Sequence, residues 1–165
     1  MTASLRSTDR LAVTALDPRP PFPGADSAPE LAFTGLAEQA RLLSGRQVSP
    51  RELVELSLAR IEESQPRLNA FRVVCPETAL AEADRADVRL RGGDGGANAP
   101  LLGVPVAIKD DVDLAGHPTP FGCGGTVEEC RADAELVHRL RRAGAIIVGK
   151  TQAPEVGQWH FTESP

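Results

Sequence analysis

The chain has 165 residues, of which 41% are hydrophobic and 25% charged, as expected for a globular protein with one domain-sized core. The formal net charge of −5 gives no electrostatic reason to expect binding to nucleic acid or to an anionic membrane. No apolar run approaches the ~20 residues that span a bilayer. Three cysteines, Cys75, Cys123 and Cys130, form no C-x-x-C pair, and this sparse, odd number indicates reduced thiols. We therefore expect a cytoplasmic protein.

The first 30 residues differ in composition from the rest of the chain. Their stretch DPRPPFPGADSAP holds five of the 14 prolines. Proline fixes φ and donates no backbone hydrogen bond, so residues 1–30 are predicted to form a disordered, Pro-rich lead-in. Residues 31–165 are assigned to the folded part.

Two helices are predicted at the start of the folded part. The stretch LAEQARLLSG has one apolar face, and Gly45 is expected to end it in a left-handed turn. In VSPRELVELSLARIEESQP, Ser49 is a predicted N-cap, Pro50 takes the first helical position and Glu52 completes a capping box.

A strand and a third helix are predicted next. NAFRVV, residues 69–74, has the composition of a short strand, and PETALAEADRADVRL, residues 76–90, that of an alanine-faced helix. The glycines of GGDGGANAP, residues 92–100, then predict a flexible loop.

The second half of the chain contains two strongly apolar runs. LLGVPVAIK, residues 101–109, is apolar on both alternating sets of positions apart from Lys109, which predicts a strand buried on both faces. A helical pattern in DAELVHRLRRAG, residues 133–144, precedes a second buried strand, AIIV, residues 145–148. Strand, helix and strand in this order indicate a crossover unit of the α/β class.

The stretch GAIIVGKT, residues 144–151, matches the phosphate-binding P-loop pattern G-x-x-x-x-G-K-[ST]. A P-loop has a strand before its first glycine and a helix after its lysine, whereas here a predicted helix comes first and the x residues form the predicted strand. We therefore do not expect Lys150 to bind ATP or GTP. Gly144 is instead expected to end the helix, and Gly149 to let the chain leave the strand.

Lys109 is unusual because it closes an otherwise apolar strand. Burial of an ammonium group is costly unless the group is paired or loses its proton. One interpretation is therefore an ion pair with Asp110, Asp111 or Asp113 in a solvated acidic turn. The other is a functional role, because parallel sheets place functional groups at the carboxyl ends of their strands. The residues alone leave both interpretations open.

Three stretches together resemble the amidase signature enzymes. They are SPRELVELSLARIEESQPRLNAF, LLGVPVAIKDDVDLAGHPT and DAELVHRLRRAGAIIVGKTQAPE, which occur in the order typical of the family. The resemblance covers roughly residues 33–163. It implies an α/β/α fold around a mixed sheet and hydrolysis of small-molecule amides by a Ser–cis-Ser–Lys triad without a cofactor or metal. It also implies that Lys109 is the catalytic lysine, whose neutral amine acts as general base.

The sequence departs from the family pattern at several positions. Asp111 stands where the family usually has Asn, and a carboxylate there favours the protonated amine and opposes the action of Lys109 as a base. Gln152 replaces a common Asn, and Cys123 a common Ser. These departures bear on the substrate class more than on the fold.

The serines of the triad have no counterpart in the expected region. The family's serines lie downstream in a Gly/Ser-rich segment, but this chain has no serine between Ser64 and Ser164. We therefore expect residues 31–165 to form the N-terminal part of an amidase domain, with an incomplete fold and no activity of its own. Uncovered sheet edges are expected to make the isolated chain associate.

Alternative functions remain open. The chain could be the amidase subunit of a tRNA-dependent amidotransferase, or a non-catalytic remnant that serves as an interaction module. Cys123 is a candidate nucleophile, although no neighbouring base is evident. The spacing of the cysteines and histidines fits no standard zinc site. In a complete enzyme, Trp159 and Phe161 are expected to pack in the core or near the substrate cleft.

Overall fold

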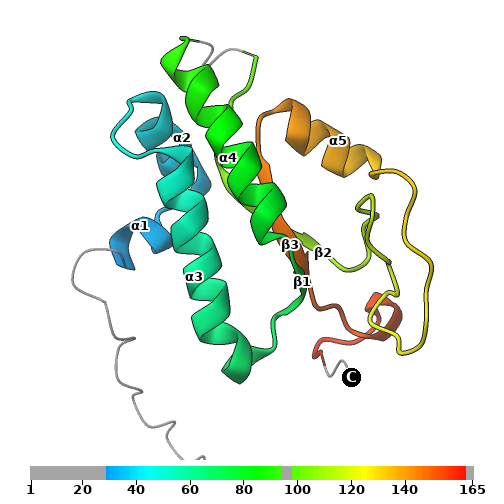
Figure 1. The fold of residues 1–165 in the computed structure, drawn as a ribbon. Coiled ribbons are helices and arrows are strands. Elements are labelled where there is room, and N and C mark those ends of the chain that lie inside the picture. Colours follow the sequence, from blue (N-terminus) through cyan, green and yellow to red (C-terminus); the bar gives the residue numbers. More distant parts are fainter. Residues whose placement is uncertain (1–28, 94–97, 163–165) are drawn as a thin grey trace, which may run out of the picture.

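The computed structural model describes residues 29–93 and 98–162 (Figure 1). The predicted lead-in over residues 1–30 lies almost wholly outside the described residues, as does the centre of the predicted loop over residues 92–100. The α-helices are α1 (Pro29–Phe33), α2 (Leu36–Ser44), α3 (Pro50–Leu68), α4 (Pro76–Arg91) and α5 (Glu135–Arg142). The strands are β1 (Phe71–Val74), β2 (Pro105–Lys109) and β3 (Ile146–Thr151), and a short 3-10 helix, η1, covers Glu155–Gly157.

The three strands form a mixed sheet in the order β1-β3-β2. β2 and β3 are parallel and joined through α5, so the predicted crossover unit is confirmed, whereas β1 runs antiparallel to β3. The pairing of β2 with β3 shifts by one residue between Val106 and Ala107. The predicted mixed sheet is thus present, with β3 at its centre.

Side chains of β3 divide between two hydrophobic clusters. Ile146 and Val148 belong to the larger cluster, which includes residues of α2, α3 and α4. Ile147 belongs to the smaller one, with Ile108 of β2 and Val137 of α5. Helices therefore cover β3 from both faces, as the α/β prediction requires, and the long helices α3 and α4 lie side by side (Figure 1).

The ends of two helices follow from their capping residues. The Ser49 hydroxyl accepts the backbone N–H of Glu52, and the Glu52 carboxylate accepts the backbone N–H of Ser49, so the predicted capping box is confirmed. The prediction for Gly45 is wrong. Gly45 has φ −77°, and the left-handed residue is Arg46, one position later, with φ 55°.

β2 is less buried than its sequence predicts. Ala107 and Lys109 are exposed, whereas Ile108 is buried. β2 lies at one edge of the described sheet, so only β3 has a neighbouring strand on each side. The prediction of burial on both faces is therefore right for β3 and wrong for β2.

The P-loop-like stretch has the helix-then-strand order that the sequence predicts. Gly144 follows α5 with φ +91°, which confirms its role in ending the helix. Gly149, however, does not let the chain leave the strand, because β3 continues to Thr151. A Cβ atom at Gly149 would lie 2.3 Å from the Val73 carbonyl oxygen, so this glycine permits the close approach of β1 to β3.

Candidate functional site

The chain contains two lysines, Lys109 and Lys150, and both lie near the carboxyl end of a strand. In the register of the parallel pair, Ile108 lies opposite Lys150, and Lys109 lies opposite Thr151. Successive side chains of a strand point to opposite faces of a sheet. The two lysine side chains therefore leave the sheet on opposite faces.

Lys109 lies in an exposed setting. Its side chain is 47% exposed, and its Nζ donates a hydrogen bond of 2.8 Å to Oδ2 of Asp111. The predicted ion pair with a neighbouring aspartate is thus confirmed for Asp111. An ion pair this exposed contributes little to stability.

Lys150 has the opposite environment, with a side chain that is fully buried. Its Nζ donates hydrogen bonds to the Pro118 carbonyl oxygen at 2.7 Å and to Oγ1 of Thr119 at 2.8 Å. The same Nζ lies 3.1 Å from Oδ1 of Asp110. Lys150 therefore connects the central strand to the end of β2 and to the loop that follows it.

Asp110 is the buried counter-ion of Lys150. Its side chain is fully buried, and Nε of Arg72, on β1, lies 3.8 Å from its Oδ2. Within the described residues neither carboxylate oxygen accepts a hydrogen bond, so cations alone offset its charge. The backbone N–H of Asp110 donates to the Thr151 carbonyl oxygen at 3.0 Å. The expectation of a solvated acidic turn is therefore wrong for Asp110.

Sequence reasoning missed Lys150 and Asp110 as a buried pair. Lys150 was considered only as a P-loop lysine, and Asp110 only as a partner for Lys109. The available signal was that GKT, like IKD, follows a strongly apolar run. A lysine at such a position needs a carboxylate or several acceptors if the strand is central.

The thiols lie in the loops around this sheet. Burial raises the pKa of the Cys75 thiol, whose Sγ is 3.5 Å from Nε2 of His117. Cys123, the candidate nucleophile, is partly exposed and its thiol lies 3.7 Å from the Phe121 carbonyl oxygen. Among residues 29–93 and 98–162, no three metal-ligating side chains cluster, so this part of the chain offers no metal centre.

The late aromatic pair is exposed. Trp159 and Phe161 are 58% and 51% exposed, with ring centroids 6.0 Å apart. The described residues alone do not cover these two rings, and their packing in a complete enzyme stays a prediction.

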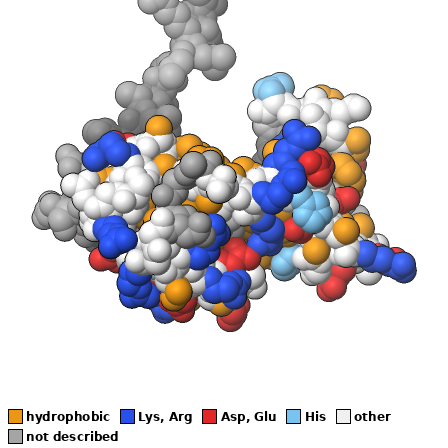
Figure 2. Space-filling model, turned by 90° about the horizontal axis from the view of Figure 1, so that it is seen from above, with side chains coloured by type: hydrophobic (Ala, Val, Ile, Leu, Met, Phe, Trp, Pro, Cys, Tyr) orange, Lys and Arg blue, Asp and Glu red, His pale blue; other side chains and the backbone are white. Residues whose placement is uncertain are grey.

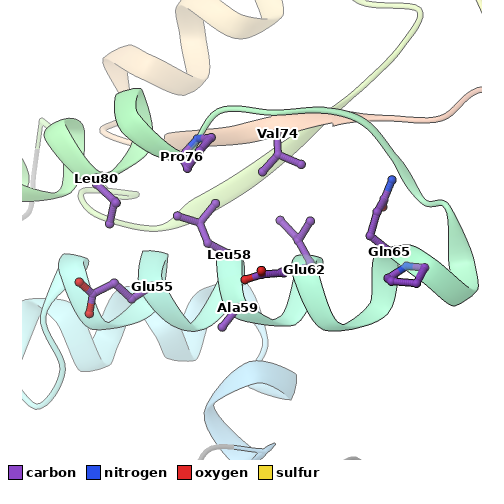
Figure 3. Close-up of a pocket in the computed structure, with 10 residues that line it drawn as sticks. Glu55, Leu58, Ala59, Glu62, Gln65, Val74, Pro76 and Leu80 are labelled. Carbon is purple, nitrogen blue, oxygen red and sulfur yellow. The ribbon is translucent and has the colours of Figure 1, made fainter.

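An open apolar pocket of about 720 Å³ lies between α3, the end of β1 and α4 (Figure 3). Leu58, Val74 and Leu80 contribute apolar walls, and Glu55 and Glu62 lie beside them on α3. Neither lysine lines this pocket. It is therefore separate from the candidate site at the ends of β2 and β3.

Charges on the surface are mixed in sign. Figure 2 shows basic and acidic side chains interspersed on one face of the molecule. Ion pairs among the described residues include Arg51 with Asp84 and Arg141 with Asp133. No helix in the described ranges is long and apolar enough to cross a membrane.

Comparison with known proteins identifies the class to which this fold belongs. A family model described as Amidase matches residues 52–165. The chain is 56% identical over 123 residues to AmiA2 of Mycobacterium tuberculosis, a protein named as an amidase, and the match covers 74% of this chain and 25% of AmiA2. The native peptide amidase from Stenotrophomonas maltophilia superposes with a TM-score of 0.69 and is 33% identical, over 78% of this chain and 26% of that one.

The chain belongs to the amidase family, which confirms the resemblance to amidase signature enzymes. It is also 36% identical over 138 residues to a subunit of the glutamyl-tRNA(Gln) amidotransferase of Dehalococcoides mccartyi, a match that covers 82% of this chain and 27% of that protein. The chain thus spans about a quarter of the length of these relatives. Its mixed sheet and flanking helices correspond to one region of the amidase fold.

Proposed function

We propose that this chain contributes the catalytic lysine of an amidase that hydrolyses the C–N bond of small-molecule carboxylic amides. The observation that carries the proposal is the position of Lys109. It ends a parallel strand within the region that the family model matches, and its amine is accessible at the carboxyl end of the sheet. Ligands of α/β proteins typically bind at this end.

The proposed chemistry is that of a Ser–cis-Ser–Lys triad. The neutral amine of Lys109 accepts a proton from the bridging serine, which in turn accepts the proton of the nucleophilic serine as that serine attacks the amide carbonyl. The proton then returns to the leaving amine, and water hydrolyses the acyl-enzyme. Because residues 65–163 include no serine, both serines must come from outside that range, and these 165 residues alone should be inactive.

Asp111 is an obstacle to this chemistry in the described arrangement. Its carboxylate pairs with Lys109 at 2.8 Å and stabilises the charged ammonium, which cannot accept a proton. Catalysis therefore requires Lys109 to turn from Asp111 towards the bridging serine. The pair is exposed, so the cost of breaking it is small, of order 1 kcal/mol or less.

The test uses a chimera of AmiA2 in which residues 52–162 of this chain replace the matching segment. A fluorophosphonate probe labels an activated nucleophilic serine whatever the natural amide is, so the labelling rate reports the triad without knowledge of the substrate. Lys109→Ala should lower the labelling rate and amide hydrolysis by about 10²–10⁴-fold, the usual contribution of a general base.

The matched control is Arg139→Ala, which removes a cation from the exposed face of α5. It should leave both rates unchanged. A folded Lys109→Ala chimera that labels at the parent rate would refute the proposed role of Lys109.

A component of a tRNA-dependent amidotransferase is the second candidate, supported by the 36% identity to the Dehalococcoides mccartyi protein. The two functions differ in the acceptor of the released ammonia. Hydrolysis that proceeds without a partner protein or tRNA favours the free amidase, and the 56% identity to AmiA2 supports that reading. We propose that either enzyme works in the cytoplasm and without a cofactor. Association through sheet edges is a separate expectation, which concerns the isolated chain.

A further inference from the structure

The buried pair of Lys150 and Asp110 is a direct neighbour of the candidate catalytic lysine in the chain and in the sheet. Asp110 follows Lys109 in the sequence, and its backbone N–H is hydrogen-bonded to the carbonyl oxygen of Thr151 at 3.0 Å. Lys150 precedes Thr151 in β3, and its Nζ lies 3.1 Å from the Asp110 carboxylate. The end of β2 is therefore attached to β3 twice, through the backbone and through buried charges.

The same ammonium also holds the loop after β2. Pro118 and Thr119 lie eight and nine residues after Asp110, and both accept hydrogen bonds from Lys150. The three contacts of Lys150 Nζ thus fix both ends of the segment from Asp110 to Thr119, which directly follows Lys109. A short hydrogen-bonded segment of this kind restricts the backbone conformations of the residue at its start.

Asp110 depends strongly on Lys150. With neither carboxylate oxygen hydrogen-bonded within the described residues, Lys150 at 3.1 Å and Arg72 at 3.8 Å are the cations that offset its charge there. An unpaired buried carboxylate is strongly unfavourable and moves towards water. Loss of the Lys150 charge would therefore displace Asp110, and with it the backbone of Lys109.

We propose that Lys150 is a positioning residue that fixes the place and orientation of Lys109 by anchoring Asp110 and the loop at Pro118 and Thr119. The proposal rests on the catalytic role of Lys109 put forward above. Lys150 itself is buried and touches no substrate. It acts through the backbone of its neighbours, so the lysine of the P-loop-like motif serves catalysis without binding a phosphate.

The first test is Lys150→Met in the AmiA2 chimera, because methionine approximates the length of lysine without its charge. Fluorophosphonate labelling should slow by about ten- to a hundredfold, the scale of a misplaced catalytic group, at a temperature where circular dichroism shows the chimera to be folded. The acetylation rate of Lys109 in the folded chimera should change as well, because its amine is displaced. A lysine that serves only stability would leave that rate unchanged.

A gentler variant covers the case in which Lys150→Met does not fold. Thr119→Val removes one hydrogen bond to Lys150 and a 3.3 Å contact with the Cys130 thiol, while nearly keeping the side-chain shape and all charges. It should slow labelling by about two- to tenfold, the range of a single hydrogen bond. Arg142→Met, which removes a cation from the exposed surface of α5, is the control and should leave the rate unchanged.

The outcomes separate this proposal from the one on which it rests. If Lys109→Ala abolishes labelling while Thr119→Val and a folded Lys150→Met chimera keep the parent rates of labelling and of Lys109 acetylation, the positioning role is overturned and the catalytic role stands. If Lys109→Ala keeps the parent rate, the catalytic role fails. The coupling between the Lys150 contacts and the position of Lys109 is then tested without catalysis, by the rate at which Lys109 is acetylated in the 165-residue chain. A changed rate in Thr119→Val supports the coupling, and an unchanged rate overturns it.

Discussion

Lys109 and Lys150 both lie near the carboxyl end of a strand, in two adjacent parallel strands, yet their surroundings are opposite. Lys109 is 47% exposed and pairs with Asp111 on the surface, whereas Lys150 is fully buried and holds Asp110, Pro118 and Thr119. The difference follows from strand order together with the face that each side chain takes: β3 is central and β2 lies at an edge of the described sheet, and the two lysines leave it on opposite faces. The buried amine of Lys150 can make only structural contacts, whereas the exposed amine of Lys109 can still react.

The largest loss of stability is expected when the charge of Lys150 is removed. In the AmiA2 chimera, Lys150→Met should lower the free energy of unfolding by about 3–5 kcal/mol, because Asp110 is left buried without its main partner. Urea denaturation followed by circular dichroism measures the change. The double variant Lys150→Met with Asp110→Asn should recover part of the loss, and a single variant as stable as the parent would contradict the buried pair.

A second variant tests whether β3 is as tightly enclosed as the burial of Lys150 implies. Gly149→Ala places a Cβ atom 2.3 Å from the Val73 carbonyl oxygen, which forces β1 and β3 apart. Such overpacking should cost about 1–3 kcal/mol in urea denaturation.

Gly92→Ala is the matched control for this variant. Gly92 follows α4 with φ −72°, and an added Cβ meets only ordinary contacts there. Its stability should stay close to that of the parent. If Gly149→Ala and Gly92→Ala lowered the free energy of unfolding equally, the effect would not come from the packing of β1 against β3.

The smallest effect is expected at the exposed lysine. Asp111→Asn removes the surface partner of Lys109 and should change the free energy of unfolding by less than about 1 kcal/mol. Asp110→Asn, one residue away, leaves the buried Lys150 without a carboxylate and should cost several times more. Similar losses for these neighbouring aspartates, measured in the same urea titrations, would argue against different environments for the two lysines.

Much of the fold could be predicted because its signals are local. The capping box of Ser49 and Glu52 and the helix-ending Gly144 depend on residues within one turn of each other, and the structure confirms both. The apolar run after Gly144 likewise predicts a buried strand whatever its neighbours are.

The site could be predicted only in part because it depends on long-range contacts. The burial of Lys150 comes from the central position of β3 and from Pro118, 32 residues earlier in the chain. The one-residue shift in register beside Ala107 helps to set which face each lysine takes, and no local pattern encodes it. Lys109 is singled out by its place in a resemblance, and its catalytic role stays a prediction.

The central claim, that the two lysines differ in accessibility, can be measured directly by acetylation of the 165-residue chain under native conditions. Mass spectrometry follows each lysine separately, and denatured chain in urea gives the reference rates. The account predicts that Lys109 is acetylated at least about tenfold faster than Lys150 in the native chain, because Lys150 reacts only when the sheet opens, and that the rates converge in urea. Equal native rates for the two lysines would contradict it.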